Sequence, residues 1–242
     1  MTHRVLLYGG TVRMPPSSFH IVYKCPDDKP CFIWKRDNAS NFVVTLMNSP
    51  SGSGKTALLG GLYDRLKGRK IESDGLMFDF DPDYNFPDNA AVGVIPQNPP
   101  MVNHWRLQEI LPKTSMFIKC FFPEENGMTA FWKKRLGEFS GGQIRKLYTC
   151  SALERMAIRC ADQNFLLLDE TFDGLGVIET KRCLSEIKTT WLDKIKKPIH
   201  LLVVTHLNDE EVTVGAVSVS TVSLSVMNSN SDELCVSVLN KR

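Results

Sequence analysis

The run Ser49-Pro-Ser-Gly-Ser-Gly-Lys-Thr56 decides the fold because of what lies on either side of it. Before it, Phe42–Met47 (FVVTLM) is a continuous apolar run, as expected of a strand buried on both faces. After it, apolar residues recur at helical spacing over Ala57–Leu66. Gly52 and Gly54 let the loop backbone turn so that successive N–H groups converge on one point. The stretch therefore predicts a strand, a tight anion-binding loop and a helix in direct succession.

The loop fits the P-loop pattern at its Gly-Lys-Thr end, and this pattern predicts a site for nucleotide phosphates. The start of a helix carries a partial positive charge that favours an anion. Lys55 is expected to reach the terminal phosphates, and the Thr56 hydroxyl can ligate Mg²⁺. The pattern has glycine where this chain has Ser49, so we expect some adjustment of the loop there. The residues expected to contact the nucleotide are Ser49, Pro50, Ser51, Gly52, Ser53, Gly54, Lys55, Thr56 and Ala57.

A second motif places two carboxylates at the end of a buried strand. Phe165–Leu168 is a short apolar run, and Asp169 and Glu170 follow it directly. In P-loop enzymes such an aspartate holds Mg²⁺. The neighbouring glutamate could orient or deprotonate an attacking water. The acidic pair therefore supports ATP hydrolysis, with ATP and Mg²⁺ as the expected ligands.

Apolar strands alternate with helices through the middle of the chain, which favours an α/β fold with a central, mostly parallel sheet. We expect a single P-loop NTPase domain over residues 1–242, with a small antiparallel β-subdomain and a short helical subdomain at about 98–160. Residues 103–134 are expected to be mainly helical with breaks, and 207–242 to form a C-terminal β-hairpin region. The other expected strands are Val5–Tyr8, Phe19–Tyr23, Cys31–Trp34, Gly75–Phe80, Ala91–Ile95 and Leu201–Thr205, and the other helices Gly141–Arg159 and Val177–Lys197.

Composition limits the classes of partner and compartment. The formal net charge is only +2, so nucleic-acid binding is possible but gets no support from charge. Seven cysteines occur without a CxxC pair, which favours reduced thiols over a disulfide framework or a zinc site. No run of eighteen apolar residues occurs. We expect a cytoplasmic protein, which a partner could hold at the inner face of a membrane.

Further motifs make the chain resemble the ABC-type ATPases, that is, ATP-binding cassette domains. Phe139-Ser-Gly-Gly-Gln143, followed by Ile-Arg-Lys, is similar to that family's signature motif, with Phe139 in place of the usual leucine. Gln97 in VIPQNP is similar to the Q-loop, and His206 in VVTH to the switch histidine. All these motifs stand in the family's order, over about residues 40–210.

The resemblance implies a site shared between two copies. Two such domains would enclose two ATP molecules head to tail, so the expected partner is a second ABC domain. The signature of one copy would touch the γ-phosphate held by the other, through Ser140, Gly141, Gly142 and Gln143. A helix that begins on glycines offers N–H groups and a dipole to such an anion.

The resemblance also assigns roles to single residues. Glu170 would be the catalytic base, and Lys55 and His206 would contact the γ-phosphate. Gln97 would join Thr56 and Asp169 as a ligand of Mg²⁺. An aromatic side chain near the N-terminus would stack on adenine, with Tyr23 the first candidate and Trp34 the second.

Two departures leave the partner class open. Thr171 stands where the family usually has proline, and Gly176 where it usually has aspartate. The first hypothesis is an ATPase subunit that energises a membrane transporter, because PQNPPMVNHWRLQEIL resembles transporter versions. The alternative is a soluble ABC ATPase that drives a nuclease or a nucleic-acid-processing complex, which the departures and the unusual tail favour. The segment from Gln97 to Ser140 is too short for the long coiled-coil insert of the chromosome-structure branch.

Overall fold

The computed structural model describes residues 2–4, 19–24, 30–36, 41–48, 55–67, 77–79, 90–100, 102–125, 127–206 and 218–222. Its centre is a parallel sheet with the strand order β6-β7-β8-β4-β9. These strands are β4 (Phe42–Met47), β6 (Ala90–Ile95), β7 (Gln163–Asp169), β8 (Ile199–Val204) and β9 (Ser218–Val222). Every residue of β4, β7 and β8 is buried, which explains why apolar residues make up most of each strand.

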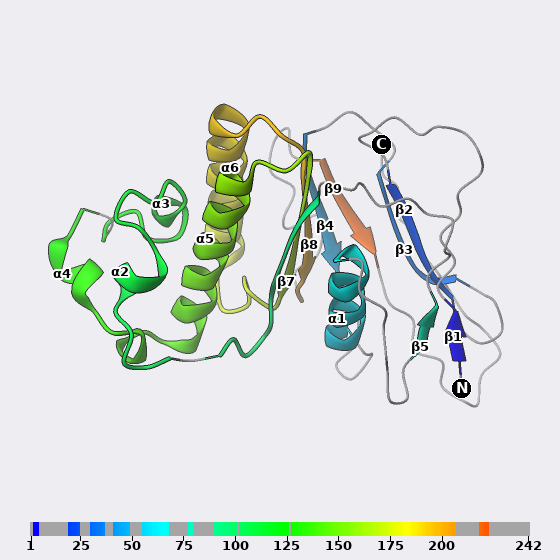
Figure 1. The fold of residues 1–242 in the computed structure, drawn as a ribbon, viewed down its shortest axis with the longest axis horizontal. Coiled ribbons are helices and arrows are strands. Elements are labelled where there is room, and N and C mark those ends of the chain that lie inside the picture. Colours follow the sequence, from blue (N-terminus) through cyan, green and yellow to red (C-terminus); the bar gives the residue numbers. More distant parts are fainter. Residues whose placement is uncertain are drawn as a thin grey trace.

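Helices cover both faces of this sheet (Figure 1). On one face lie α5 (Gly141–Arg159) and α6 (Val177–Lys194), and on the other lies α1 (Lys55–Leu66). The core between sheet and helices contains Phe42, Leu147, Leu166 and Trp191, each at most 1% exposed. Burying such a side chain contributes about 1.5–3 kcal/mol. The arrangement confirms the expected P-loop NTPase fold with a central parallel sheet.

The helical subdomain lies beyond α5, at the far end of the molecule from the small sheets (Figure 1). It contains three very short helices and one 3-10 turn: α2 (Leu107–Ile110), α3 (Ile118–Phe121), α4 (Thr129–Lys133) and η1 (Leu136–Glu138). The expectation that residues 103–134 are mainly helical was therefore wrong. Pro112 and Pro123 interrupt the stretch, and its apolar residues pack as an aromatic cluster instead of one helix face. In that cluster the Phe131 ring meets those of Phe122 and Phe139 at centroid distances of 5.4 and 5.7 Å.

Two small sheets lie on the other side of the molecule. β2 (Phe19–Lys24) pairs antiparallel with β3 (Pro30–Arg36), close to the expected strands Phe19–Tyr23 and Cys31–Trp34. β1 (Thr2–Arg4) pairs parallel with β5 (Met77–Asp79). The expected strand Val5–Tyr8 lies outside the described residues.

The C-terminal region contributes β9, which extends the main sheet parallel to β4. The other residues of the expected C-terminal hairpin lie outside the described part of the chain. Within the described part, no helix combines the length and the apolar character needed to cross a bilayer.

Candidate functional site

The candidate residues gather at the carboxyl edge of the main sheet. Asp169 ends β7 and pairs in register with Val204, which ends β8. Val204 also pairs with Met47, which ends β4. In a parallel sheet the residues that follow neighbouring strands emerge at one edge, where open α/β sheets bind ligands. The register therefore brings together the loops that carry Gln97, Glu170 and His206 and the start of α1.

The start of α1 is joined directly to the acidic strand. Lys55 is the first residue of α1 and is buried. Next to it, the Thr56 hydroxyl donates a hydrogen bond of 2.7 Å to Asp169 Oδ2. Asp169 is only 2% exposed, so this bond gives a buried carboxylate a donor. The helix start and the strand end are thus held together, as a site shared by these two motifs requires. Residues 49–54 lie outside the described residues.

Glu170 has a left-handed backbone, with a φ of +51°. This conformation is uncommon for a residue with a side chain and is concentrated at functional sites. The Glu170 N–H donates to the carbonyl of Val204 at 3.1 Å, which fixes the turn against β8. The side-chain amide of Gln97 donates to Glu170 Oε2 at 2.5 Å. The Q-loop-like segment and the acidic strand therefore meet at this carboxylate.

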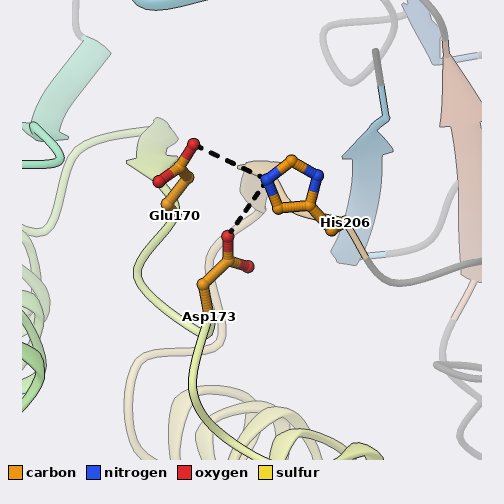
Figure 2. Close-up of side chains that lie close together, drawn as sticks. All are labelled: Glu170, Asp173 and His206. Atoms are coloured by element: carbon orange, nitrogen blue, oxygen red, sulfur yellow. Dashed lines mark ion pairs between the residues drawn. The ribbon is translucent and has the colours of Figure 1, made fainter. Parts of the chain in front are cut away.

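His206 faces two carboxylates (Figure 2). Its Nε2 lies 3.9 Å from Glu170 Oε1 and 3.7 Å from Asp173 Oδ2. Asp173 also accepts a hydrogen bond of 3.1 Å from the Thr205 hydroxyl. The sequence motifs indicate Glu170 and His206 but give no role to Asp173 or Thr205. The proximity of Asp173 to a histidine 33 positions later depends on the turn after β7, which no local pattern reveals.

The segment that carries Gln97 is attached to α5. The Tyr148 hydroxyl donates to the carbonyl of Pro100 at 2.7 Å, and Arg145 Nη1 lies 3.5 Å from the carbonyl of Gln97. No role was expected for either side chain, although Arg145 belongs to the Ile-Arg-Lys that follows the signature-like residues. α5 therefore links the signature at its start to the segment that holds Gln97.

The signature-like residues form the start of α5. Ser140 is the N-cap: its hydroxyl accepts from the Gln143 N–H at 3.3 Å, and Gln143 Oε1 accepts from the Ser140 N–H at 2.9 Å. This capping box stabilises the first turn of the helix. A Cβ added at Gly141 or Gly142 would meet nothing within 4 Å. Packing within the described chain therefore does not require glycine at either position.

The substitution of phenylalanine for leucine in the signature has a local explanation. Phe139 is buried and meets Phe131 edge-on, with an interplanar angle of 89°. Lys134 Nζ lies 5.6 Å from the centroid of the Phe139 ring. The larger ring thus belongs to the aromatic cluster of the helical subdomain.

For the remaining candidates the structure gives the backbone position alone. Tyr23 lies in β2 opposite Phe32, and Trp34 lies in β3 opposite Ile21. Ala57 lies in α1. Adenine stacking by Tyr23 or Trp34 stays a prediction.

The chemistry of this edge suits a nucleotide with a hard cation. The buried cation of Lys55 lies at the start of a twelve-residue helix, and both features favour an anion. The Thr56 hydroxyl and the Asp169 carboxylate offer the oxygen ligands that Mg²⁺ prefers. The donor set therefore fits Mg²⁺, with Glu170 and His206 on the adjacent loops.

Solved structures resemble the chain at low sequence identity. The dimeric post-hydrolysis state of the ATP-binding cassette MJ0796, bound to ADP and Pi, is 16% identical over 91% of each chain, with a TM-score of 0.50. RNase-L Inhibitor is 18% identical over 92% of this chain, which spans 38% of that one, with a TM-score of 0.49. A putative ABC transporter ATP-binding protein from Pyrococcus furiosus is 14% identical over 92% of this chain and 96% of that one, with a TM-score of 0.46.

No protein-family model and no curated protein matches the chain. At these identities a structural likeness establishes the fold. The parallel sheet, the order of the motifs along it and the likeness to the MJ0796 cassette agree on one architecture. The chain has the fold of an ABC-type ATP-binding cassette.

Proposed function

We propose that this chain binds ATP with Mg²⁺ and hydrolyses it. The observation that carries the proposal is the 2.7 Å hydrogen bond from Thr56 to the buried carboxylate of Asp169. It joins the end of the phosphate-loop motif to the acidic strand, 113 positions apart in sequence. The cassette that resembles this fold was solved with ADP and Pi.

Thr56, Asp169 and Gln97 would hold Mg²⁺. When bound, the cation would offset the negative charge of the terminal phosphates. Lys55 would add a positive charge from the protein itself, in a buried position where electrostatic interactions are less screened than in water. Two hard oxygen donors already lie within hydrogen-bond distance of each other, which supports this assignment.

Glu170 would act as the general base. Its left-handed backbone and the hydrogen bond from Gln97 orient the carboxylate at the sheet edge. There it would accept a proton from the attacking water at a carboxylate oxygen. His206 would donate a hydrogen bond to the γ-phosphate, and Asp173 would hold the imidazole in place. Thr205, which donates to Asp173, would orient that second carboxylate.

A second copy would complete the site. The start of α5 is exposed at Ser140 and Gly141, and the glycines leave its backbone open to an approaching anion. The capping box already uses the side chains of Ser140 and Gln143, so the free N–H groups of the first turn would face a phosphate of the partner's ATP. Packing within the described chain does not require glycine at these two positions. Contact with another molecule therefore explains the glycines better than packing does.

The ATPase would energise a membrane-spanning partner. The resemblance of the segment after Gln97 to transporter versions supports this role, as does the compact helical subdomain. Isolation of the full chain with a multi-span protein from the membrane fraction would support it. ATPase activity that nucleic acid stimulates, without such a partner, would contradict it.

Hydrolysis is tested with two variants and a control. Lys55→Ala is expected to weaken ATP binding, measured by equilibrium binding of a fluorescent ATP analogue. Glu170→Gln is expected to retain ATP, lower phosphate release by about 100-fold or more, and favour a dimer in size-exclusion chromatography with ATP. Glu124→Gln, an exposed glutamate in the helical subdomain, is the matched control and should behave as wild type. Undiminished phosphate release by Glu170→Gln would show that the base assignment is wrong.

A further inference from the structure

A groove of ≈ 310 Å³ lies along one edge of the main sheet. Its floor is formed by four successive residues of β6, Ala91–Val94. Among the described strands, β6 is the last on this side of the sheet. The walls come from α1 and α5, which cover opposite faces of the sheet. The groove therefore follows a strand edge that no described strand pairs with.

The groove lies apart from the candidate ATP site. Its walls use the C-terminal turns of α1 and α5, around Lys67 and Arg159. Lys55 and Ser140 lie at the opposite ends of the same two helices. A ligand could therefore occupy the groove while nucleotide is bound.

The walls of the groove are cationic. Arg155 and Arg159 are exposed and lie one helical turn apart on the same face of α5, and Lys67 comes from α1. Within the described part of the chain, the guanidinium group of neither arginine has a hydrogen bond or an ion pair. Among the described residues that line the groove, none carries a carboxylate. Two like charges at this spacing repel slightly, so an anion in the groove would relieve a cost already present in the free protein.

The floor of the groove is apolar and has the shape of a strand. Ala91, Val92 and Val94 line it together with Met156 of α5. An edge strand presents backbone N–H and C=O groups that a further strand can pair with. A small anion would use the cations but not the strand edge, whereas an extended acidic peptide would use both. The combination therefore favours a peptide over a small phosphate compound.

We propose that this groove binds an extended acidic segment of a partner protein, by strand addition to β6. Backbone hydrogen bonds to β6 would set the register, and apolar side chains of the segment would cover Val92 and Val94. Its carboxylates would point towards α5 and pair with Arg155 and Arg159. The inference concerns a docking site and does not depend on ATP hydrolysis.

The probe is a fluorescein-labelled peptide in which glutamate alternates with valine, and its length matches the six residues of β6. Fluorescence anisotropy with the full chain should show binding that weakens as salt rises. The variant Arg155→Glu/Arg159→Glu should bind about tenfold more weakly or worse. Lys113→Glu/Lys133→Glu changes the net charge equally at exposed positions of the helical subdomain and should bind as wild type. Equal weakening in both double variants would overturn the proposal, because only overall charge would then matter.

Two further arms use the wild-type protein and so do not depend on whether a variant folds. A peptide of the same sequence, N-methylated at alternate residues, cannot complete the strand pairing and should bind about tenfold more weakly. If it binds as well as the parent peptide, strand addition is wrong. Inorganic phosphate and chloride are compared as competitors at equal ionic strength. Phosphate should displace no more peptide than chloride does. Displacement beyond the chloride control would make the groove a simple anion site and would also refute the proposal.

Discussion

Replacement of Thr56 by valine removes the hydroxyl that joins α1 to the acidic strand and nearly preserves the shape of the side chain. The bond is 2.7 Å long, and its acceptor belongs to a carboxylate that is 2% exposed. Hydrogen bonds to charged groups contribute about 1.5–3 kcal/mol. Because Thr56 itself is exposed, water can replace part of the lost donor. We therefore expect Thr56→Val to lower the free energy of unfolding by about 1.5–2 kcal/mol.

Such a loss corresponds to a fall in Tm of about 3–8 °C for a chain of this size. Thr56→Ser keeps the hydroxyl and is the matched control, with a change expected within about 0.5 kcal/mol. Urea unfolding followed by circular dichroism measures both variants without nucleotide. The same series with MgATP tests the second role of the hydroxyl. At about 100 times its Kd, a ligand stabilises the native state by about 2.7 kcal/mol. The Mg²⁺-dependent part of this stabilisation is the difference between ATP with Mg²⁺ and ATP without it. Thr56→Val should lose most of that difference.

Two outcomes would refute the reasoning. If Thr56→Val and Thr56→Ser unfold at the same urea midpoint, the hydrogen bond to Asp169 contributes nothing in solution. If MgATP stabilises the valine variant as much as the wild type, Thr56 is not a ligand of the cation. The first outcome concerns the packing of the site and the second its chemistry, so the two roles are measured separately.

Three other substitutions or conditions test details of the structure. Thr171 is 1% exposed and its hydroxyl has no partner among the described residues. Thr171→Val should therefore raise the free energy of unfolding by up to about 1 kcal/mol, measured by urea unfolding. A lower free energy of unfolding would mean that the hydroxyl is hydrogen-bonded. Gly176 is the N-cap of α6, with an extended backbone and open space where a Cβ would lie. Gly176→Asp should therefore raise the free energy of unfolding by a few tenths of a kcal/mol in the same assay. Clear destabilisation of the protein would contradict this. Burial raises the pKa of the Cys120 thiol to about 11 and that of Cys183 to about 12, from 9.0. Since the folded-state pKa values lie above the unfolded value, the stability that these thiols contribute is complete below pH 9 and is lost as pH rises towards 11 or 12. Urea midpoints of the wild type between pH 8 and 11 should fall more steeply than those of a Cys183→Ala variant, and parallel curves would refute the assignment.

The strands and long helices could be predicted from sequence because local signals mark them. β4 has the predicted bounds, since an unbroken apolar run lies before a glycine-rich loop. α5 also has its predicted bounds, Gly141–Arg159, because the Ser140 cap and Gln143 stand at its start. β8 is displaced by a residue or two, and α6 ends three residues before the predicted Lys197. Helix ends that lack a strong cap are hard to place from sequence.

Other parts depend on contacts that are distant in sequence. Between 103 and 134, apolar residues serve an aromatic cluster around Phe131, and their spacing resembles that of a helix only by coincidence. The hairpin region expected over residues 207–242 contains β9 but could not reveal β4 as its parallel neighbour. Asp173 lies beside His206 in the turn after β7, which begins at Glu170 with its positive φ angle. The motifs thus predicted which loops meet, while the turns decide which further side chains join them.

The row of paired strand ends has a consequence for changes in chain length. Met47, Val204 and Asp169 stand level with one another across three neighbouring strands. Insertion of one residue within β8 would advance the strand by about 3.3 Å and exchange its two faces. His206 would then leave Glu170 even though every residue of the site is still present. Apolar substitutions of similar volume within these strands should therefore be better tolerated than insertions or deletions, and the lengths of β4, β7 and β8 should be as constrained as the site residues themselves.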